Sequence, residues 1–153
     1  MNIEMPNPGV TVMIDAASID VWNRHAWRIA PNGREVVATV DGVPQRLHRV
    51  LMSAPPDLEV DHINGNPLDN RLENLRLCTH AENMRNRKMH KNNRLGLKGV
   101  YVDNRPNSAK PFRAQIRVAG KKHFLGAFST AVEASKAYSV AAKIHHGEFA
   151  RNL

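Results

Sequence analysis

Cysteine and aromatic residues are scarce in this chain of 153 residues, which has one cysteine and 5% aromatic residues. A single cysteine excludes an intrachain disulfide and a zinc site built on several cysteines. It also favours a reducing compartment, the cytoplasm, over secretion. We expect Cys78 to pack inside the protein as a small apolar residue. With so few aromatic residues the chain is one domain or two small ones, and a single large core is not expected.

Long apolar runs and an evident signal peptide are also missing, which argues against a membrane protein and against secretion. Positive charge, in contrast, is abundant: the formal net charge is +8 and the isoelectric point is about 10.2. A basic protein can bind anionic membranes, but without an apolar run the simplest polyanionic partner is nucleic acid.

The middle of the chain has the pattern of two short strands and a helix. Residues 59–63 read as a strand that ends in an Asn-Gly turn at 64–65. Residues 74–78 alternate polar and apolar side chains, which indicates a second strand. Thr-x-x-Glu at 79–82 is a capping box, so a helix is expected to begin at about His80. The predicted order is strand, loop, strand, helix.

Four polar residues of this segment are candidates for metal-dependent chemistry: Asp61, His62, Asn74 and Asn83. The first turn of the predicted helix would bring Asn83 back toward Asp61. A carboxylate and an amide oxygen are hard ligands that suit Mg²⁺ or Mn²⁺. Histidine, with an ordinary pKa near ~6.5, can take a proton from water at neutral pH. Each residue alone is commonplace and would also fit a surface loop and a helix cap.

Taken together, residues 60–87 resemble the HNH nuclease motif, the ββα-metal fold, in its homing-endonuclease branch. The resemblance rests on the run V-D-H-I-N-G-N-P-L-D-N-R-L-E-N-L-R-L-C-T-H-A-E-N-M-R-N-R. It implies that Asp61 and Asn83 hold one divalent ion, Mg²⁺ or Mn²⁺. It further implies that His62 is the general base, that Asn74 braces the loop and the histidine, and that the products carry 3′-hydroxyl and 5′-phosphate ends.

The residues before this motif predict a small β-rich unit. We expect residues 1–11, which contain prolines and lack a period, to be a loosely ordered lead-in. Residues 27–29 and 34–40 read as strands joined by Asx-Gly turns. Residues 46–52 match an L-H-R-hydrophobic segment that often precedes the motif in the same family, which suggests a short helix with His48 as a supporting residue.

Positive charge is concentrated after the motif. Residues 85–122 contain 12 of the 22 lysines and arginines and one acid, Asp103. Such a run is usually a solvated face, but beside a nuclease site phosphate contact is the better interpretation, with Arg85 and Arg87 closest in sequence. Residues 89–96 lack a clear period and are predicted to be a basic linker.

The last third predicts a three-stranded antiparallel sheet packed on one helix. Strands are expected at 99–102, 112–118 and 122–126. A second capping box at 130–133 should open a helix that ends near Gly147. The apolar stripe of that helix consists of Ala134, Ala137, Tyr138, Ala141 and Ile144. The opposite sheet face would then be free to bind DNA or would simply be solvated.

Residues 97–153 resemble the APETALA-2/ethylene-response-factor DNA-binding domain, through K-G-V-Y, F-R-A-Q-I-R, F-L-G-A-F-S-T, E-A-S-K-A-Y and H-G-E-F-A-R-N-L. In that family the sheet enters the major groove. Phe112 and Phe124 replace frequent tryptophans, and Tyr101 and Asp103 replace frequent arginines, so base preference does not transfer. The resemblance implies DNA contacts from Lys98, Tyr101, Arg113, Gln115, Arg117, Lys122 and Phe124.

These features together predict an α+β protein with a nuclease domain at 1–88, a linker at 89–96 and a DNA-binding domain at 97–153. The expected function is a metal-dependent, site-directed DNA endonuclease of the HNH homing type, from a phage or another mobile element. Its partner would be double-stranded DNA, bound as a monomer or a homodimer in the host cytoplasm. The alternatives are a DNA-binding regulator whose HNH part is only a scaffold and, less favoured, a nuclease acting on RNA.

Overall fold

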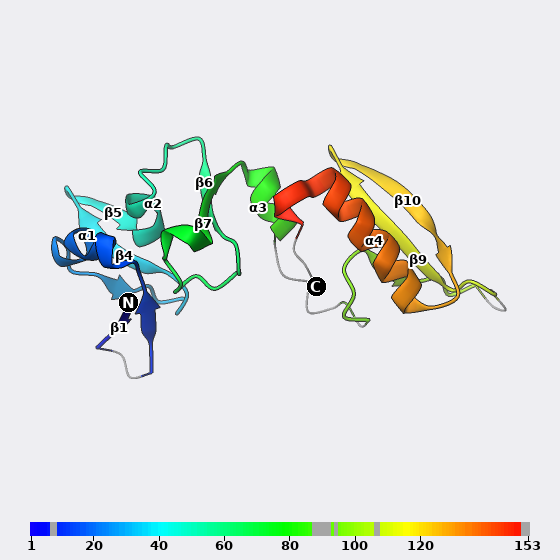
Figure 1. The fold of residues 1–153 in the computed structure, drawn as a ribbon, viewed down its shortest axis with the longest axis horizontal. Helices are drawn as coiled ribbons and strands as arrows, with labels where there is room; N and C mark the ends of the chain where they lie inside the picture. The colour runs from blue at the N-terminus through cyan, green and yellow to red at the C-terminus, as the bar shows by residue number, and fades with distance from the viewer. Residues whose placement is uncertain (7–8, 87–92, 94, 106–107, 151–153) are drawn as a thin grey trace. The chain divides into compact units, whose positions relative to one another are not determined.

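The chain divides into two units, Met1–Met84 and Arg85–Leu153, each built on small antiparallel sheets (Figure 1). The structure is a computed structural model, and it describes residues 1–6, 9–86, 93, 95–105 and 108–150. No helix within these ranges is long and apolar enough to cross a membrane. The mixed α+β class is as predicted, whereas the predicted domain limits stay a prediction.

The first residues of the chain form a hairpin, so the expectation of a loosely ordered lead-in was wrong. Strand β1 (Asn2–Glu4) pairs antiparallel with β2 (Thr11–Met13), with Ile3 opposite Val12. Strands of three residues are too short to display alternation in the sequence. They are ordered because Val12 is completely buried in the core that follows.

A short 3-10 helix η1 (Ala16–Ser18) and helix α1 (Ile19–Asn23) lead from the hairpin into a three-stranded meander. The meander has the order β3 (Arg28–Ile29), β4 (Val36–Val40), β5 (Val43–Arg46), all antiparallel. Helix α2 (Leu47–Leu51) follows β5 directly. The expected strands around residues 27–40 and the short helix within 46–52 are thus confirmed.

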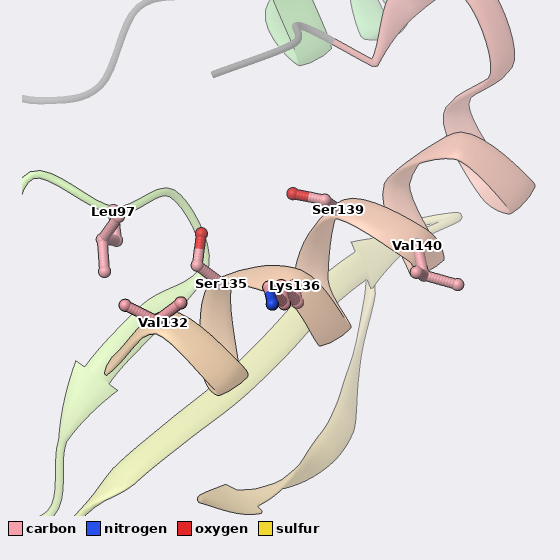
Figure 2. Close-up of a pocket in the computed structure, with 6 residues that line it drawn as sticks. All are labelled: Leu97, Val132, Ser135, Lys136, Ser139 and Val140. Carbon is pink, nitrogen blue, oxygen red and sulfur yellow. The ribbon is translucent and has the colours of Figure 1, made fainter. Parts of the chain in front are cut away.

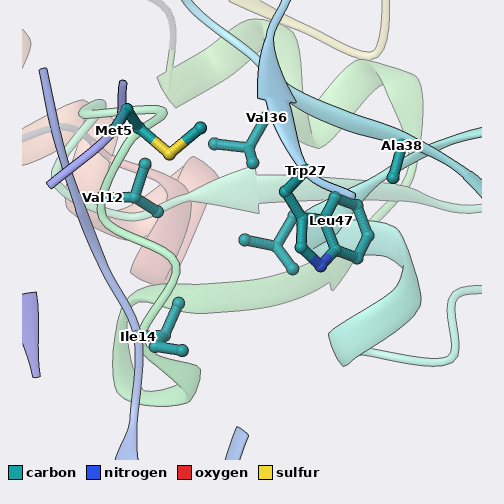
Figure 3. Close-up of a cluster of buried hydrophobic side chains, with 7 residues drawn as sticks. All are labelled: Met5, Val12, Ile14, Trp27, Val36, Ala38 and Leu47. Carbon is teal, nitrogen blue, oxygen red and sulfur yellow. The ribbon is translucent and has the colours of Figure 1, made fainter. Parts of the chain in front are cut away.

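The core of the first unit is aliphatic, with one large aromatic side chain. Trp27 is buried and stacks on the partly buried Trp22, with ring centroids 6.2 Å apart. Burial of such side chains removes most of their apolar area from water and is the main stabilising contribution in a small unit. The buried residues of this core, drawn in Figure 3, are Met5, Val12, Ile14, Trp27, Val36, Ala38 and Leu47.

The motif segment folds in the predicted order of strand, loop, strand and helix. Strand β6 (Glu59–His62) pairs antiparallel with β7 (Leu75–Cys78), and the short 3-10 helix η2 (Leu72–Asn74) precedes β7. Helix α3 (His80–Asn86) follows β7 at once. Its capping box is formed, since Thr79 N donates to the Glu82 carboxylate at 2.8 Å and Glu82 N donates to Thr79 Oγ1 at 3.3 Å.

The second unit is the predicted three-stranded antiparallel sheet with one helix packed on it. The strand order is β10 (Lys121–Phe128), β9 (Phe112–Val118), β8 (Val100–Val102). Helix α4 (Ala131–His146) lies along the sheet, as Figure 1 shows, and ends in a 3-10 turn, η3 (Gly147–Phe149). Both halves of the capping box at Thr130 and Glu133 are present.

Small residues allow α4 to lie close against the sheet. Ala134, Ala141 and Ala142 are buried on α4, as is Tyr138, and they meet Ala114 and Ile116 of β9. The predicted stripe was wrong at Ile144, which is 72% exposed. One turn beyond Ala142 it is the half-buried His146 that faces the sheet, with its Nε2 3.1 Å from the Arg117 carbonyl oxygen.

We predict that Gly99→Ala strongly destabilises the second unit, whereas Gly120→Ala does so only mildly. Both glycines have positive φ, +72° and +78°, which costs an alanine about 1–2 kcal/mol. At Gly99 the added Cβ would also lie 2.0 Å from the Tyr138 ring and 2.8 Å from the Gln115 carbonyl oxygen, whereas at Gly120 it meets open space. Urea denaturation should give a loss of at least about 3 kcal/mol for Gly99→Ala; equal losses would contradict the packing argument.

Candidate functional site

Asp61 lies on β6, opposite Arg76 of β7, and the two side chains form an ion pair. Arg76 donates to Asp61 Oδ2 through Nε at 3.0 Å and through Nη2 at 2.7 Å. The side chains are only 7% and 11% exposed, respectively, so the carboxylate is mostly withdrawn from water. A charge in that position needs a partner, and the guanidinium supplies it.

His62 ends the same strand and is buried among polar neighbours. Its ring meets the ring of His48 edge to face, with centroids 5.0 Å apart, and its Nε2 lies 3.4 Å from Asn70 Oδ1. Burial lowers the pKa of His62, although the Asn70 contact and the charges of Asp61 and Asp69 act in the opposite direction. His62 is therefore a neutral imidazole at pH 7.

The tautomer of His62 follows from how Asn70 is held. Asn70 Nδ2 donates to the Pro67 carbonyl oxygen at 3.3 Å, so its Oδ1 is the atom that faces His62. An amide oxygen only accepts, which assigns the imidazole proton to His62 Nε2. In the neutral ring Nδ1 then has the lone pair, and Nδ1 is the basic atom.

Asn74 connects the two ends of the loop between β6 and β7. Its Oδ1 accepts from Asn64 N at 2.9 Å, and its Nδ2 donates to the Asp69 carbonyl oxygen at 2.7 Å. Its own carbonyl oxygen accepts from Ile63 N at 2.9 Å. These hydrogen bonds tie Asn64 and Asp69 together across the loop, and the loop residue Asn70 in turn contacts His62.

The N-terminal hairpin also supports this loop. Met13 N donates to the Leu68 carbonyl oxygen at 2.9 Å, and Asn70 N donates to the Met13 carbonyl oxygen at 2.7 Å. Farther along, Asp15 Oδ2 accepts from Leu72 N at 2.6 Å. Strand β2 and the residues that follow it therefore help to hold the loop of the site in place.

Asn83, on α3, faces Glu59 at the start of β6. Asn83 Nδ2 donates to Glu59 Oε2 at 2.5 Å, and His80 Nδ1 lies 2.7 Å from Glu59 Oε1. The Asn83 hydrogen bond, followed by that of His80, lowers the pKa of the Glu59 carboxyl. Glu59 thus joins the strand that carries Asp61 to the helix that carries Asn83.

The donor chemistry of Asp61 and Asn83 fits a hard divalent ion. Asp61 offers carboxylate oxygens, and the Nδ2 contact to Glu59 leaves Asn83 Oδ1 as its acceptor. Within the described ranges, no three His, Cys, Asp or Glu side chains gather as metal ligands. Of the predicted ligands Asp61 and Asn83, only Asp61 is one of these four residue types. The absence of such a group therefore does not argue against the pair.

In the second unit, the sheet register places six of the predicted DNA-binding side chains on one face. Directly opposed residues of antiparallel strands share a face, as do residues two apart on one strand. The opposed pairs are Tyr101 with Arg113, Gln115 with Phe124, and Arg117 with Lys122. This face is the one opposite Ala114 and Ile116, which α4 covers.

Arg113 is the most constrained cation of that face. Its guanidinium pairs with Asp103 at 2.6 Å and lies over the Phe124 ring, 5.7 Å from the centroid. Asp103 also pairs with Arg105 at 2.6 Å. Of the other predicted DNA contacts, Lys98 precedes β8 and donates through Nζ to the Arg85 carbonyl oxygen, and Arg87 lies outside the described residues.

A shallow hollow beside α4 is not a second candidate for the functional site. Figure 2 shows it bounded by aliphatic side chains and two hydroxyls, with Lys136 as its one titratable group. It therefore has no imidazole or carboxylate that could activate a hydroxyl, and no set of metal ligands. Its lining consists of Leu97, Val132, Ser135, Lys136, Ser139 and Val140.

The sequence reasoning missed the residues that support the site, namely Glu59, Asn70 and Arg76. Glu59 could have been found, because it stands two positions before Asp61 on a predicted strand and so shares its face. Arg76 could have been found in the same way on β7. Asn70 lies in the irregular loop, where no period predicts its contact with His62.

Comparison with known proteins adds three findings. A family model described as HNH endonuclease matches residues 53–85, which include β6, β7 and Asn83. Protein 3.8 of Escherichia phage T7 is 34% identical over 97 residues, 63% of this chain and 77% of that protein. A protein of Acanthamoeba polyphaga mimivirus, named as an uncharacterized HNH endonuclease, is 30% identical over 142 residues, 87% of this chain and 71% of that protein. No solved structure gives a significant match.

We predict that His48→Gln makes the first unit less sensitive to acid. Burial, followed by the charges of His62, Arg46 and Arg49, lowers the pKa of His48 from 6.5 to about 3. Below pH 6.5 the unfolded chain therefore takes up a proton that the folded chain refuses, and stability falls as the pH drops toward 3. This contribution is about 3 kcal/mol between pH 7 and pH 4.

Thermal unfolding of wild type and His48→Gln at several pH values between 7 and 4 measures this contribution. The two stability curves should converge as the pH falls, because glutamine takes up no proton. Curves that stay parallel would show that His48 takes up its proton equally in the folded and unfolded chains.

Proposed function

This chain belongs to the HNH endonuclease family, and we propose that it is a metal-dependent, site-directed DNA endonuclease of the homing type. The observation that carries the proposal is the environment of His62. Burial keeps the imidazole neutral, and Asn70 orients it. His62 directly follows Asp61, whose carboxylate is also buried. A neutral, oriented imidazole is what a general base requires.

In the proposed reaction His62 takes a proton from a water molecule through Nδ1 while the water oxygen attacks phosphorus. The new bond joins that oxygen to phosphorus, and the bond from phosphorus to the 3′ oxygen breaks. The products are a 5′-phosphate and a 3′-hydroxyl end, whose oxygen takes its proton from solvent. Asn74 contributes by fixing the loop on which Asn70 is placed.

Asp61 and Asn83 are the proposed ligands of one Mg²⁺ or Mn²⁺ ion. When bound, the ion supplies charge stabilisation at the phosphate and at the leaving 3′ oxygen. Arg76 supports the arrangement by orienting the Asp61 carboxylate through its two hydrogen bonds.

Double-stranded DNA is the proposed substrate, and the sheet of the second unit is proposed to position it. Support comes from the shared face that Arg113, Gln115 and Arg117 form with three neighbours, and from the net charge of +8. The likeness of residues 97–153 to the APETALA-2/ethylene-response-factor domain favours insertion of this sheet face into the major groove. There arginine can read guanine and glutamine can read adenine. A single active site cuts one strand, so a monomer would nick and a homodimer would break both strands.

We predict that His62→Ala abolishes conversion of supercoiled plasmid while leaving DNA binding nearly unchanged. Loss of a general base slows hydrolysis by about 100-fold or more. Conversion should require Mg²⁺ or Mn²⁺ and stop with EDTA. His145→Ala is the matched control, because His145 is exposed at the end of α4. Genomic DNA from the source organism should serve as a second substrate, in case the plasmid lacks the target.

Each outcome of this assay has a definite meaning. Nicked circles that depend on metal and on His62 support a monomeric nicking enzyme, whereas direct linearisation indicates paired active sites. Retained binding with no cleavage of either DNA by wild type would replace the proposal with a DNA-binding regulator. Cleavage of a matched RNA duplex in preference to DNA would change the substrate class.

We predict that Arg117→Ala weakens DNA binding and lowers its salt dependence, whereas Lys136→Ala does not. Both substitutions remove one exposed positive charge from the second unit. Arg117 belongs to the open sheet face, whereas Lys136 is on α4, beside the hollow. The salt slope of log K should fall by about 1 for Arg117→Ala, because one cation fewer is brought to the DNA. Equal effects of the two variants would mean that binding follows net charge and not the sheet face.

A further inference from the structure

Glu59 receives a contact from each of two residues on the first turn of α3. Oε2 accepts from Asn83 Nδ2 at 2.5 Å, and Oε1 lies 2.7 Å from His80 Nδ1. Neither the chemistry derived for His62 nor the predicted metal ligands use this carboxylate. Its side chain is 38% exposed, so it is not merely a buried charge that requires neutralisation.

The strand geometry places Glu59 beside the proposed metal ligand Asp61. The two residues are separated by one position on β6 and therefore project from the same face. Their partners across the ladder are Cys78 and Arg76, also two apart on β7. The contact between Glu59 and Asn83 thus connects the helix ligand to the strand face that carries the other ligand.

The chemistry of the pair decides which way the Asn83 amide faces. An asparagine side chain has a donor end and an acceptor end of nearly equal size, so its orientation depends on its partners. An ionised carboxylate only accepts hydrogen bonds. Facing Glu59, Asn83 must present Nδ2, and the acceptor Oδ1 is directed to the other side of the amide.

We propose that Glu59 is a positioning residue, which fixes the Asn83 amide with Oδ1 presented as a ligand for the divalent ion. The inference rests on the proposed function, because it assumes that Asn83 is a ligand. Glu59 acts through Asn83 and does not itself bind the ion. Partners of this kind contribute about 10- to 100-fold to metal affinity when they orient a ligand.

The contact with His80 provides the control for a merely structural role. If Glu59 only fastened α3 to β6, the His80 contact would serve as well as the Asn83 contact. His80 is 77% exposed, and an ion pair at such a surface contributes little to stability. His80→Ala should therefore leave metal binding unchanged, whereas Glu59→Ala should weaken it.

The test is a titration of the full chain with Mn²⁺ in the absence of DNA. The electron paramagnetic resonance signal of free Mn²⁺ measures how much of the ion is bound. We expect Glu59→Ala to lose at least about 10-fold in affinity. Glu59→Gln should recover most of that loss, because the glutamine carbonyl oxygen can still accept from Asn83 Nδ2. Thermal unfolding of each variant verifies that it is folded at the temperature of the titration.

A second readout observes the amide itself. In ¹H–¹⁵N spectra the side-chain NH₂ of Asn83, assigned by its absence in Asn83→Ala, should show one proton shifted downfield by the short bond to Glu59. Glu59→Ala should remove that shift, and His80→Ala should not.

The outcomes separate this inference from the proposed function. Wild type that binds no Mn²⁺, or Asn83→Ala that binds it as wild type does, would overturn the metal site and this inference with it. Weakened binding in Asn83→Ala with unchanged binding in Glu59→Ala would overturn the role of Glu59 alone. Equal losses of Mn²⁺ affinity in Glu59→Ala and His80→Ala would mean that Glu59 only fastens α3 to β6. If Glu59→Gln recovered no affinity, the negative charge of Glu59, and not its hydrogen bond to Asn83, would account for the effect.

Discussion

The buried amide of Asn74 holds both ends of the loop that separates β6 from β7. It accepts from Asn64 N near the start of the loop and donates to the Asp69 carbonyl oxygen near its end. Loss of these partners would lower the free energy of unfolding by about 1–3 kcal/mol for each buried polar group left without a hydrogen bond. Because Asn70 follows Asp69 directly, the position of the acceptor that faces His62 depends on this amide.

The first unit builds its site from segments that are distant in sequence. Backbone groups of Met13 fix one side of the loop, and His48 of α2 packs against the ring of His62. Arg49, next to His48, donates to the carbonyl oxygens of Ala54, Pro55 and Leu58 and so fixes the connector that enters β6. Segments that precede the motif thus hold the loop, the His62 ring and the entry to β6 in place.

The sequence predicted best the features that depend on local periodicity. Alternation identified β7 and β9, and the two capping boxes identified the starts of α3 and α4, because each rests on contacts within a few residues. It failed for the hairpin of β1 and β2, since strands of three residues show no period. It also failed at Ile144, where the line of contact between helix and sheet passes through His146 instead.

The candidate site was predictable in its residue types but not in its supporting contacts. Asp61, His62, Asn74 and Asn83 stand out because their spacing matches a known motif. The contacts of Asn70 with His62 and of Arg76 with Asp61 depend on loop conformation and strand register. Register follows from pairing between strands that are far apart in sequence, and that information is spread over both strands.

Burial of Cys78 in β7 has a practical consequence for labelling. The thiol is buried, which raises its pKa from 9.0 to about 11, so the reactive thiolate is about 100-fold rarer at neutral pH than for an ordinary cysteine. The natural chain therefore behaves toward maleimides and iodoacetamides almost as a cysteine-free protein. A cysteine introduced on the exposed sheet face or on α3 would become the dominant site of attachment, without prior removal of Cys78.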